Sequence, residues 1–265
     1  MRLNFLNGDI INLIGEFLNN TDNNSLRQCC LYLSIIIGKI YFRNIKVNVK
    51  KIIDNYKFRE FVHKYNLIIN VTNVNRKYEF AYLHTYNLKS IHSSYKFNRS
   101  LHECFFSKLH TLILGVDFNK EIAPHVLPPS LHTLKFVNNF NKPIKPNVLP
   151  KQLHTLIFDC DFDQLIDKYV LPQSLKTLKF SNFNQEIESH VLPASLENLD
   201  LGDEYDIHIE KDVLPKSLQT LVFSWYFDQE LDLGVLPESL QSLKFKGKFD
   251  QLIKAHILPL QLHTL

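Results

Sequence analysis

The hydrophobic positions of this chain recur at a constant spacing from Leu127 onward. A Leu-Pro pair opens each unit, and successive pairs lie 22 residues apart, with one step of 21. The pairs begin at Leu127, Leu149, Leu171, Leu192, Leu214, Leu236 and Leu258. A period in this range is typical of a solenoid, in which each unit forms one coil.

One unit contains too little apolar surface to fold alone. Its six apolar columns are occupied, in the first clear unit, by Leu131, Leu134, Phe136, Phe140, Ile144 and Val148. Burying six such side chains yields roughly 9–18 kcal/mol. Ordering the backbone of a 22-residue unit costs about 1–2 kcal/mol per residue. We therefore expect each coil to depend on its neighbours.

The alternation within a unit predicts one short strand per coil. Leu134 and Phe136 are expected to face the core, with Lys135 between them facing solvent. A second extended piece, 140–144, is expected on the return side of the coil. The Leu-Pro pair then predicts a turn, because proline fixes φ and has no N–H to donate. A coil of 22 residues leaves little room for a helix.

The same template is recognisable before the first Leu-Pro pair, from Leu88. The strand starts fall at residues 88, 109, 131, 153, 175, 196, 218, 240 and 262, and the last unit is incomplete. Leu-x-x-Leu-x-Phe resembles the strand signature of leucine-rich repeats. The units also resemble FNIP repeats, as in Phe140-Asn141-Lys142-Pro143-Ile144. Over residues 88–265 this resemblance implies a leucine-rich-repeat-like, β-rich solenoid.

Outward strand positions form two columns along the array. The first, called the hydroxyl ladder, reads Thr111, Thr133, Thr155, Thr177, Asn198, Thr220 and Ser242. The second, called the mixed ladder, reads Ile113, Lys135, Ile157, Lys179, Asp200, Val222 and Lys244. Variation in the mixed ladder is what a protein-recognition surface needs. Threonine in the hydroxyl ladder is equally explained by its preference for strands.

Trp225 and Tyr226 lie in a loop after one strand, where other units carry asparagine or glycine. Trp225 is the single tryptophan of the chain. It is either a binding hot spot or a side chain folded over the neighbouring coil. The candidate target-binding residues are Thr133, Lys135, Ile157, Lys179, Asp200, Val222, Trp225 and Lys244.

A histidine column precedes the hydroxyl ladder. It contains His110, His132, His154 and His263, and the intervening units carry lysine, glutamate or glutamine there. Stacked imidazoles would suit a metal ladder, but no cysteine joins them. We interpret the column as a solvated position copied by duplication, and we predict no metal site.

The first 43 residues have the periodicity of short helices. One apolar set, Ile10, Leu13, Ile14, Phe17 and Leu18, follows the i, i+3, i+4, i+7 spacing. A second helix is expected near Ser25 and a third over 34–42. Three such helices cannot enclose a core of their own. They either cap the first coil of the solenoid or bind another protein.

The order Leu-x-x-Asp-Ile-Ile-x-x-Ile-x-x-Phe-Leu, followed by Leu-x-x-Cys, resembles an F-box. That resemblance implies three helices that bind the adaptor protein Skp1. The implied adaptor-facing residues are Leu6, Ile10, Ile14, Leu18, Leu26 and Cys29. Asn7 stands where the family usually has proline, and no tryptophan follows Cys29. Chains that combine an F-box with FNIP repeats occur chiefly in amoebae and giant DNA viruses, which implies action inside a host cell.

The connecting region, 44–87, is expected to contain a helix at 54–65 and a short buried strand at 67–71. The predicted organisation is therefore an F-box-like helical segment over 1–43, a helix-containing bridge over 44–87 and an FNIP solenoid over 88–265. The corresponding fold class is α+β.

Charge is distributed unevenly along the chain. Residues 1–105 contain 15 Lys and Arg against 7 Asp and Glu, whereas residues 106–265 contain 15 against 20. Every arginine lies in the first part, so from residue 106 onward the repeats offer only lysines, which lack the bidentate fork that suits phosphate. We therefore expect no nucleic-acid partner.

The four cysteines have no metal-ligand spacing and are too few to staple the chain, which indicates a reducing, cytoplasmic location. We expect no signal peptide, because acidic residues occur early and no cleavage site follows. The longest apolar run, 31–42, is too short to span a membrane. No phosphate loop or hydrolase motif is present, so we predict neither catalysis nor a cofactor.

Two functional hypotheses follow from these patterns. The first is a non-enzymatic substrate-recognition subunit of an SCF-type ubiquitin ligase, in which the F-box-like segment binds Skp1 and the solenoid binds a target protein. The second is a protein-binding scaffold without a ligase role, in which the N-terminal helices only cap the solenoid.

Overall fold

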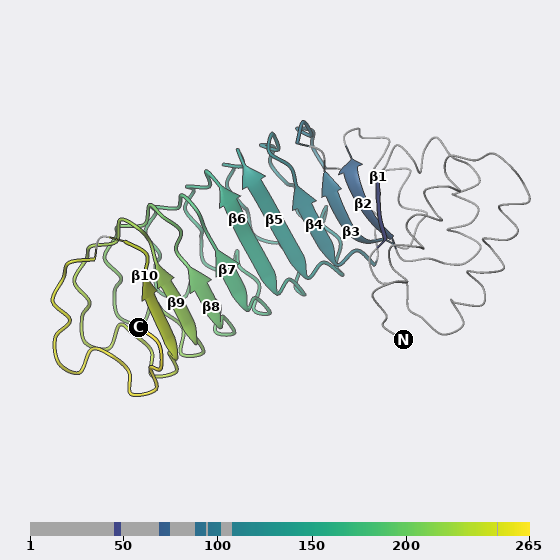
Figure 1. Cartoon of the computed structure of the whole chain (residues 1–265). Coiled ribbons are helices and arrows are strands. Elements are labelled where there is room, and N and C mark those ends of the chain that lie inside the picture. The colour runs from purple at the N-terminus through teal and green to yellow at the C-terminus, as the bar shows by residue number, and fades with distance from the viewer. Residues whose placement is uncertain (1–44, 49–68, 75–87, 94, 102–107, 248) are drawn as a thin grey trace, which may run out of the picture.

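The computed structural model describes residues 45–48, 69–74, 88–93, 95–101, 108–247 and 249–265. These residues form one 10-stranded sheet whose strands lie in chain order, so that the molecule grows as an elongated stack of coils (Figure 1). The strands are β1 (Ile45–Asn48), β2 (Ile69–Val74), β3 (Leu88–Ser93), β4 (Thr111–Leu114), β5 (Thr133–Asn138), β6 (Thr155–Cys160), β7 (Thr177–Lys179), β8 (Asn198–Asp200), β9 (Thr220–Phe223) and β10 (Ser242–Phe245).

All strand pairs are parallel, and from β4 to β10 their register follows the repeat. Thr133 pairs with Thr155, and Lys135 pairs with Ile157. The hydroxyl and mixed ladders are therefore continuous columns, as predicted. Leu134 is fully buried and its neighbours are partly exposed, so the predicted alternation is confirmed. The leucine-rich-repeat-like solenoid is thus confirmed over the repeats.

The sheet extends two strands further toward the N-terminus than the repeat pattern predicts. The strand predicted at 67–71 corresponds to β2, which pairs with β3 despite register shifts after Ile69 and after Val71. β1 pairs in turn with β2. Two strands of the predicted bridge therefore belong to the same sheet as the solenoid.

The predicted helices at 1–43 and 54–65 lie outside the described residues. Strands, turns and loops account for the part of the chain that the structure describes, and no helix occurs there. Nor does that part contain any helix of the length and apolarity that a bilayer span requires.

Two columns of aromatic rings fill the core. In one coil the two rings stack closely, as for Phe136 and Phe140, whose centroids are 3.9 Å apart. Between coils the stacking continues, with 5.3 Å between Phe136 and Phe158. Leu201 interrupts the first column, and Tyr205 occupies the second column in the same coil. Burial, reinforced by the charge of Glu186, raises the pKa of Tyr205, so its hydroxyl stays neutral.

The return side of each described coil contains no strand, and the piece predicted to be extended at 140–144 belongs to no strand ladder. It is instead held by a column of asparagine and aspartate side chains, called the Asx ladder. Each side-chain oxygen accepts a hydrogen bond from the backbone N–H of the equivalent residue in the next coil, as when Asn141 Oδ1 accepts from Asp163 N at 3.1 Å. The ladder comprises Asn98, Asn119, Asn141, Asp163, Asn184, Asp206, Asp228 and Asp250.

A second set of side chains joins the coils at the turns before β5, β7, β8, β9 and β10. Ser174 Oγ donates a hydrogen bond to the Leu153 carbonyl oxygen at 2.7 Å, and Ser195 repeats this contact with Leu175. Equivalent serines occur at Ser130, Ser217 and Ser239. Backbone N–H and C=O groups in the loops have no partner strand, and these side chains provide their hydrogen bonds instead.

One residue of each coil adopts a left-handed backbone at the turn before the Leu-Pro pair. The residues are His125, Asn147, Tyr169, His190, Asp212, Gly234 and His256, with φ between 64° and 83°. The following N–H closes the turn, as when Val148 N donates to the Lys145 carbonyl oxygen at 3.3 Å. A positive φ at the third turn position is typical of a type II turn.

Gly202 compensates for a shortened coil. The loop between Phe180 and Phe183 is one residue shorter than its counterparts, and the Ser181 backbone comes very close to Gly202. A Cβ on Gly202 would lie 2.2 Å from the Ser181 carbonyl oxygen, and φ is +84°. Only glycine is compatible with both conditions.

We expect Gly202→Ala to lower the free energy of unfolding by about 2–5 kcal/mol, because it adds a backbone collision to the strain of a left-handed alanine. Gly234→Ala is the matched control. Gly234 has φ +83°, but its Cβ would meet only the Lys211 side chain at 3.5 Å. It should lose about 1–2 kcal/mol. Urea denaturation followed by circular dichroism measures both losses, and equal losses would contradict the collision.

Candidate protein-binding face

The outward residues of β4 to β10 form one continuous surface, called the strand face. Successive coils place equivalent residues side by side along it. Thr133, Ile157 and Val222 are partly exposed there, and Lys179 and Lys244 are exposed. The seven candidate residues taken from the two ladders therefore share this face, and Trp225 lies in the loop after β9.

Lysines of the strand face are largely neutralised by carboxylates of neighbouring coils. Lys135 Nζ lies 2.7 Å from Asp159 Oδ2 in the next coil. Lys179 Nζ lies 3.0 Å from Asp200 Oδ2, also in the next coil. The sequence columns predicted Lys179 and Asp200 as neighbours in the mixed ladder, and the structure brings their charged groups together.

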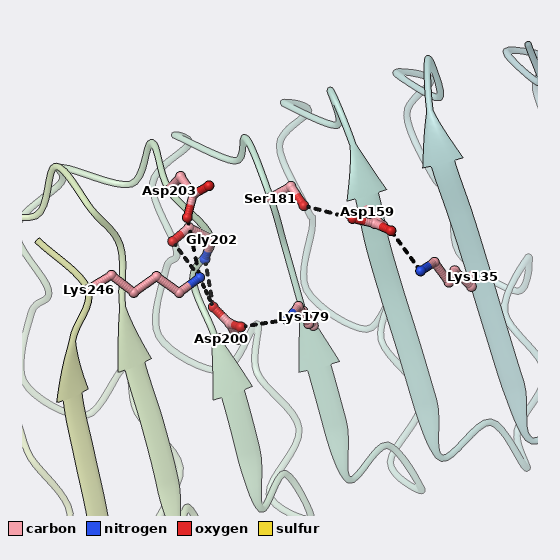
Figure 2. A network of polar contacts seen from close by, with 8 residues as sticks. All are labelled: Lys135, Asp159, Lys179, Ser181, Asp200, Gly202, Asp203 and Lys246. Atoms are coloured by element: carbon pink, nitrogen blue, oxygen red, sulfur yellow. Dashed lines mark hydrogen bonds and ion pairs between the residues drawn. The ribbon is translucent and has the colours of Figure 1, made fainter. Parts of the chain in front are cut away.

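Lys246 makes the longest polar connection on this face, because its side chain crosses a whole coil (Figure 2). Its Nζ lies 2.8 Å from Asp200 Oδ1 and donates to the Gly202 carbonyl oxygen at 3.0 Å. In the coil between them the equivalent position is Ser224, a small residue that is only 1% exposed. The small side chain leaves room for the lysine to reach two coils away.

Asp200 is the centre of this network, and its side chain is only 17% exposed. Burial alone raises the pKa of Asp200, but hydrogen bonds from Lys246, the Gly202 backbone and Lys179 together hold the pKa below its ordinary value of 3.8. The carboxylate is therefore ionised at neutral pH. Such a group, with both oxygens engaged, acts as a structural centre and not as a proton donor or nucleophile.

The charge pairing leaves a face with mixed chemistry. Ile113, Ile157 and Val222 offer partly exposed apolar surface between the neutralised pairs. Among the described residues Lys244 is a mixed-ladder lysine for which the structure shows no ion pair. Apolar patches alternating with satisfied polar groups are the chemistry of protein interfaces.

The histidine column lies beside the hydroxyl ladder. The rings of His110 and His132 stack with centroids 4.7 Å apart, and those of His132 and His154 with centroids 5.0 Å apart. Burial, with the neighbouring His132 and Lys89, lowers the pKa of His110. In the described part of the chain no three histidine, cysteine or acidic residues are grouped so that they could hold a metal ion.

Trp225 combines the two alternatives that the sequence left open. Its side chain is 48% exposed, yet one part of the indole packs against the next coil. A Cβ on Gly247 would lie 2.6 Å from the indole Cδ2 atom, so glycine makes this close packing possible. The ring is both folded over its neighbour and accessible.

Comparison with known proteins identifies the repeat. The FNIP Repeat family matches residues 97–139, 140–182, 183–225 and 227–265, which is more than half of the chain. The chain belongs to the FNIP repeat family. No match was found among curated proteins.

Two solved structures resemble the FNIP solenoid. CroV588, described as a novel circular LRR protein, is 30% identical with a TM-score of 0.55, and the match covers 75% of this chain. This chain spans 36% of the length of CroV588. An internalin (InlF) from Listeria monocytogenes is 18% identical with a TM-score of 0.44, covering 68% of this chain and 53% of the internalin. CroV588 supports the leucine-rich-repeat-like architecture of the FNIP solenoid.

Sequence reasoning missed several residues of this face. Asp159 and Lys246 belong to a third outward column, two residues after the mixed ladder, and that spacing is a signal that the sequence contains. The contact of Lys246 across two coils has no such signal, because it depends on the small size of Ser224.

We expect Asp200→Asn to lower the free energy of unfolding near pH 7 by about 1–3 kcal/mol, because it removes a charged hydrogen-bond acceptor. The pKa of Asp200 is lower in the folded state, so the stabilisation is present above the ordinary value of 3.8 and is lost as pH falls below it. Thermal unfolding near pH 7 and about pH 3 measures this difference.

Asp203→Asn is the matched control, because Asp203 is more exposed and lies 3.4 Å from Lys246. It should cost less than about 1 kcal/mol. A stability loss for Asp200→Asn that is the same at both pH values would contradict the charged network.

Proposed function

We propose that this chain is the target-binding subunit of an SCF-type ubiquitin ligase. The FNIP solenoid holds a target protein on its strand face, and the N-terminal segment binds a Skp1-like adaptor. The chain itself performs no catalysis. It raises the effective concentration of the target near the ubiquitin-loaded E2 enzyme of the ligase. This proximity is sufficient to accelerate ubiquitin transfer to the target. The proposed location is the cytoplasm, which in a viral setting is that of the host cell.

The strand face is the single observation that supports target binding. Its inward residues are constrained by the coil template, whereas the mixed ladder changes from isoleucine to lysine, aspartate and valine along the face. Recognition of a particular protein requires outward residues that differ from coil to coil, supported by buried residues that stay the same. Candidate contacts remain Thr133, Lys135, Ile157, Lys179, Asp200, Val222, Trp225 and Lys244.

The ion pairs narrow the list of direct contacts. Lys135 and Asp200 are engaged within the face, so a partner that used them would first break charged hydrogen bonds. Ile157, Val222, Lys244 and Trp225 carry no such cost. We therefore infer that the last group contributes most to binding.

The N-terminal half of the proposal rests on sequence alone. The set Leu6, Ile10, Ile14, Leu18, Leu26 and Cys29 lies outside the described residues. Its spacing gives an apolar stripe that a short helical segment cannot bury within itself. An adaptor would cover this stripe, and the FNIP solenoid behind it would be left free to hold the target.

The alternative is a protein-binding scaffold without a ligase role. In that case residues 1–43 cover the first coil of the solenoid and bind no adaptor. The same strand face would serve both functions, so only the N-terminal segment distinguishes them.

Capture of the chain by purified Skp1 tests the adaptor role. The double variant Leu6→Asp, Ile10→Asp should reduce recovery about tenfold or more, because two buried charges are placed in an apolar interface. The control is Leu165→Asp, Leu252→Asp, which makes the same chemical change at residues 61% and 78% exposed. Equal recovery of the first double variant and the unmodified chain would overturn the proposal.

Deletion of residues 1–43 separates the two hypotheses further. If these residues bind an adaptor, the truncated solenoid should remain monomeric with little change in its melting temperature. If they cap the first coil, deletion exposes apolar surface and should cause aggregation. Thermal melting and light scattering of the two proteins give the answer, and aggregation of the truncated protein would favour the scaffold.

A further inference from the structure

The loop after β9 carries two neighbouring exposed aromatic side chains, whereas the described loop after β3 carries one, Tyr95. Trp225 and Tyr226 are 48% and 45% exposed. The equivalent loops carry Asn138 and Asn139 after β5, and Asp203 and Glu204 after β8. Two neighbouring exposed aromatic side chains on one coil are not explained by the repeat template, because the other coils fold without them.

The tryptophan is already held in place before any partner binds. Its indole packs against Gly247, where a Cβ would approach within 2.6 Å of the ring. The backbone of the same loop is fixed too, because Tyr226 N donates to the Asp203 carbonyl oxygen at 3.1 Å. A ring ordered in this way loses little conformational entropy on binding.

Carboxylates border the aromatic pair on the preceding coil. The hydrogen bond between Tyr226 and Asp203 places Asp203 and Glu204 one coil away from the aromatic residues. Both are exposed, and the structure shows no ion pair for Glu204 among the described residues. Lys246 is 3.4 Å from Asp203, but its shorter contacts go to Asp200 and the Gly202 carbonyl oxygen. The negative charge of this border is therefore only partly neutralised.

We propose that Trp225, Asp203 and Glu204 form the docking site for an arginine-bearing segment of the target protein. This inference rests on the proposed function and adds the chemistry of the partner. A guanidinium group stacks on an aromatic face and donates in a plane to carboxylates beside it. Here the indole supplies the face and the preceding coil supplies the carboxylates.

Charge complementarity selects this occupant over others. A purely apolar segment would cover Glu204 without giving it a partner, which is costly. A phosphate-bearing or acidic segment would meet like charge at Asp203 and Glu204. An arginine satisfies both parts of the site, and the acidic balance of residues 106–265 attracts a basic partner over a longer range.

Trp225 reports directly on binding, because it is the single tryptophan in the chain. The full-length protein is titrated with the peptide acetyl-Gly-Arg-Gly-Arg-Gly-amide, and with the same peptide carrying lysine or glutamate in place of arginine. We expect a saturable change in tryptophan fluorescence with the arginine peptide, weaker binding of the lysine peptide and no saturation with the glutamate peptide.

Glu204→Gln should weaken binding of the arginine peptide about three- to tenfold, because it removes one charge-assisted contact. Glu238→Gln is the matched control, since Glu238 is an exposed glutamate in the turn before β10, near the N-terminal ends of the strands, whereas Glu204 follows the C-terminal end of β8. For Trp225→Ala, a fluorescein-labelled arginine peptide followed by anisotropy replaces the intrinsic signal, and binding should be lost.

Non-saturable fluorescence, equal affinity for the lysine peptide, or equal affinity of Glu204→Gln and Glu238→Gln would each overturn this inference. Failure of this docking site can be distinguished from failure of the proposed function. A chain that is captured by Skp1 but does not bind the arginine peptide keeps its ligase role and loses this docking site. A chain that binds the peptide but not Skp1 keeps the docking site as part of a scaffold.

Discussion

Stacking of one coil on the next is the interaction on which the rest of this structure depends. A single coil contributes one short strand, and the strand needs neighbours on both sides to satisfy its backbone. The return side has no strand and is held instead by the Asx ladder, through bonds such as that from Asp228 N to Asp206 Oδ1 at 3.0 Å. Aromatic rings continue the same dependence through the core. A single coil cannot fold alone, so the coils are stable only when they are stacked on one another.

This dependence separates structural from functional positions. Inward residues must match the coils on both sides, which explains why leucine and phenylalanine recur at the buried positions. Outward residues need only suit a strand, and they vary. On the strand face and in the loops that follow its strands, this freedom has produced ion pairs between neighbouring coils, the contact of Lys246 with Asp200 two coils away, and an exposed aromatic pair at Trp225 and Tyr226. The variation therefore provides both extra stability between coils and a surface that can distinguish partners.

Structural features that recur in every repeat unit can be predicted from the sequence, whereas features confined to one coil are predicted poorly. Strand positions, inward alternation and the two ladders follow from spacing alone. β1 and β2 escaped prediction as part of the sheet because their spacing is irregular, with register shifts against β3. Gly202 and the reach of Lys246 also departed from the pattern, since each depends on a local change in one coil: a missing residue beside Ser181, and a small side chain at Ser224. We infer that residues which differ from the repeat pattern determine which partner is bound.

Hydrogen exchange of the full-length chain tests most directly whether coils are held together through side chains on the return side. The backbone amides of Asn141, Asp163, Asn184 and Asp206 lie in no strand, but each donates to a side-chain oxygen of the preceding coil. We predict that these amides exchange as slowly as the amides of β5 to β8, because they open only when neighbouring coils separate. Exchange of these amides at the rate of unstructured loops, with the strands still protected, would contradict it.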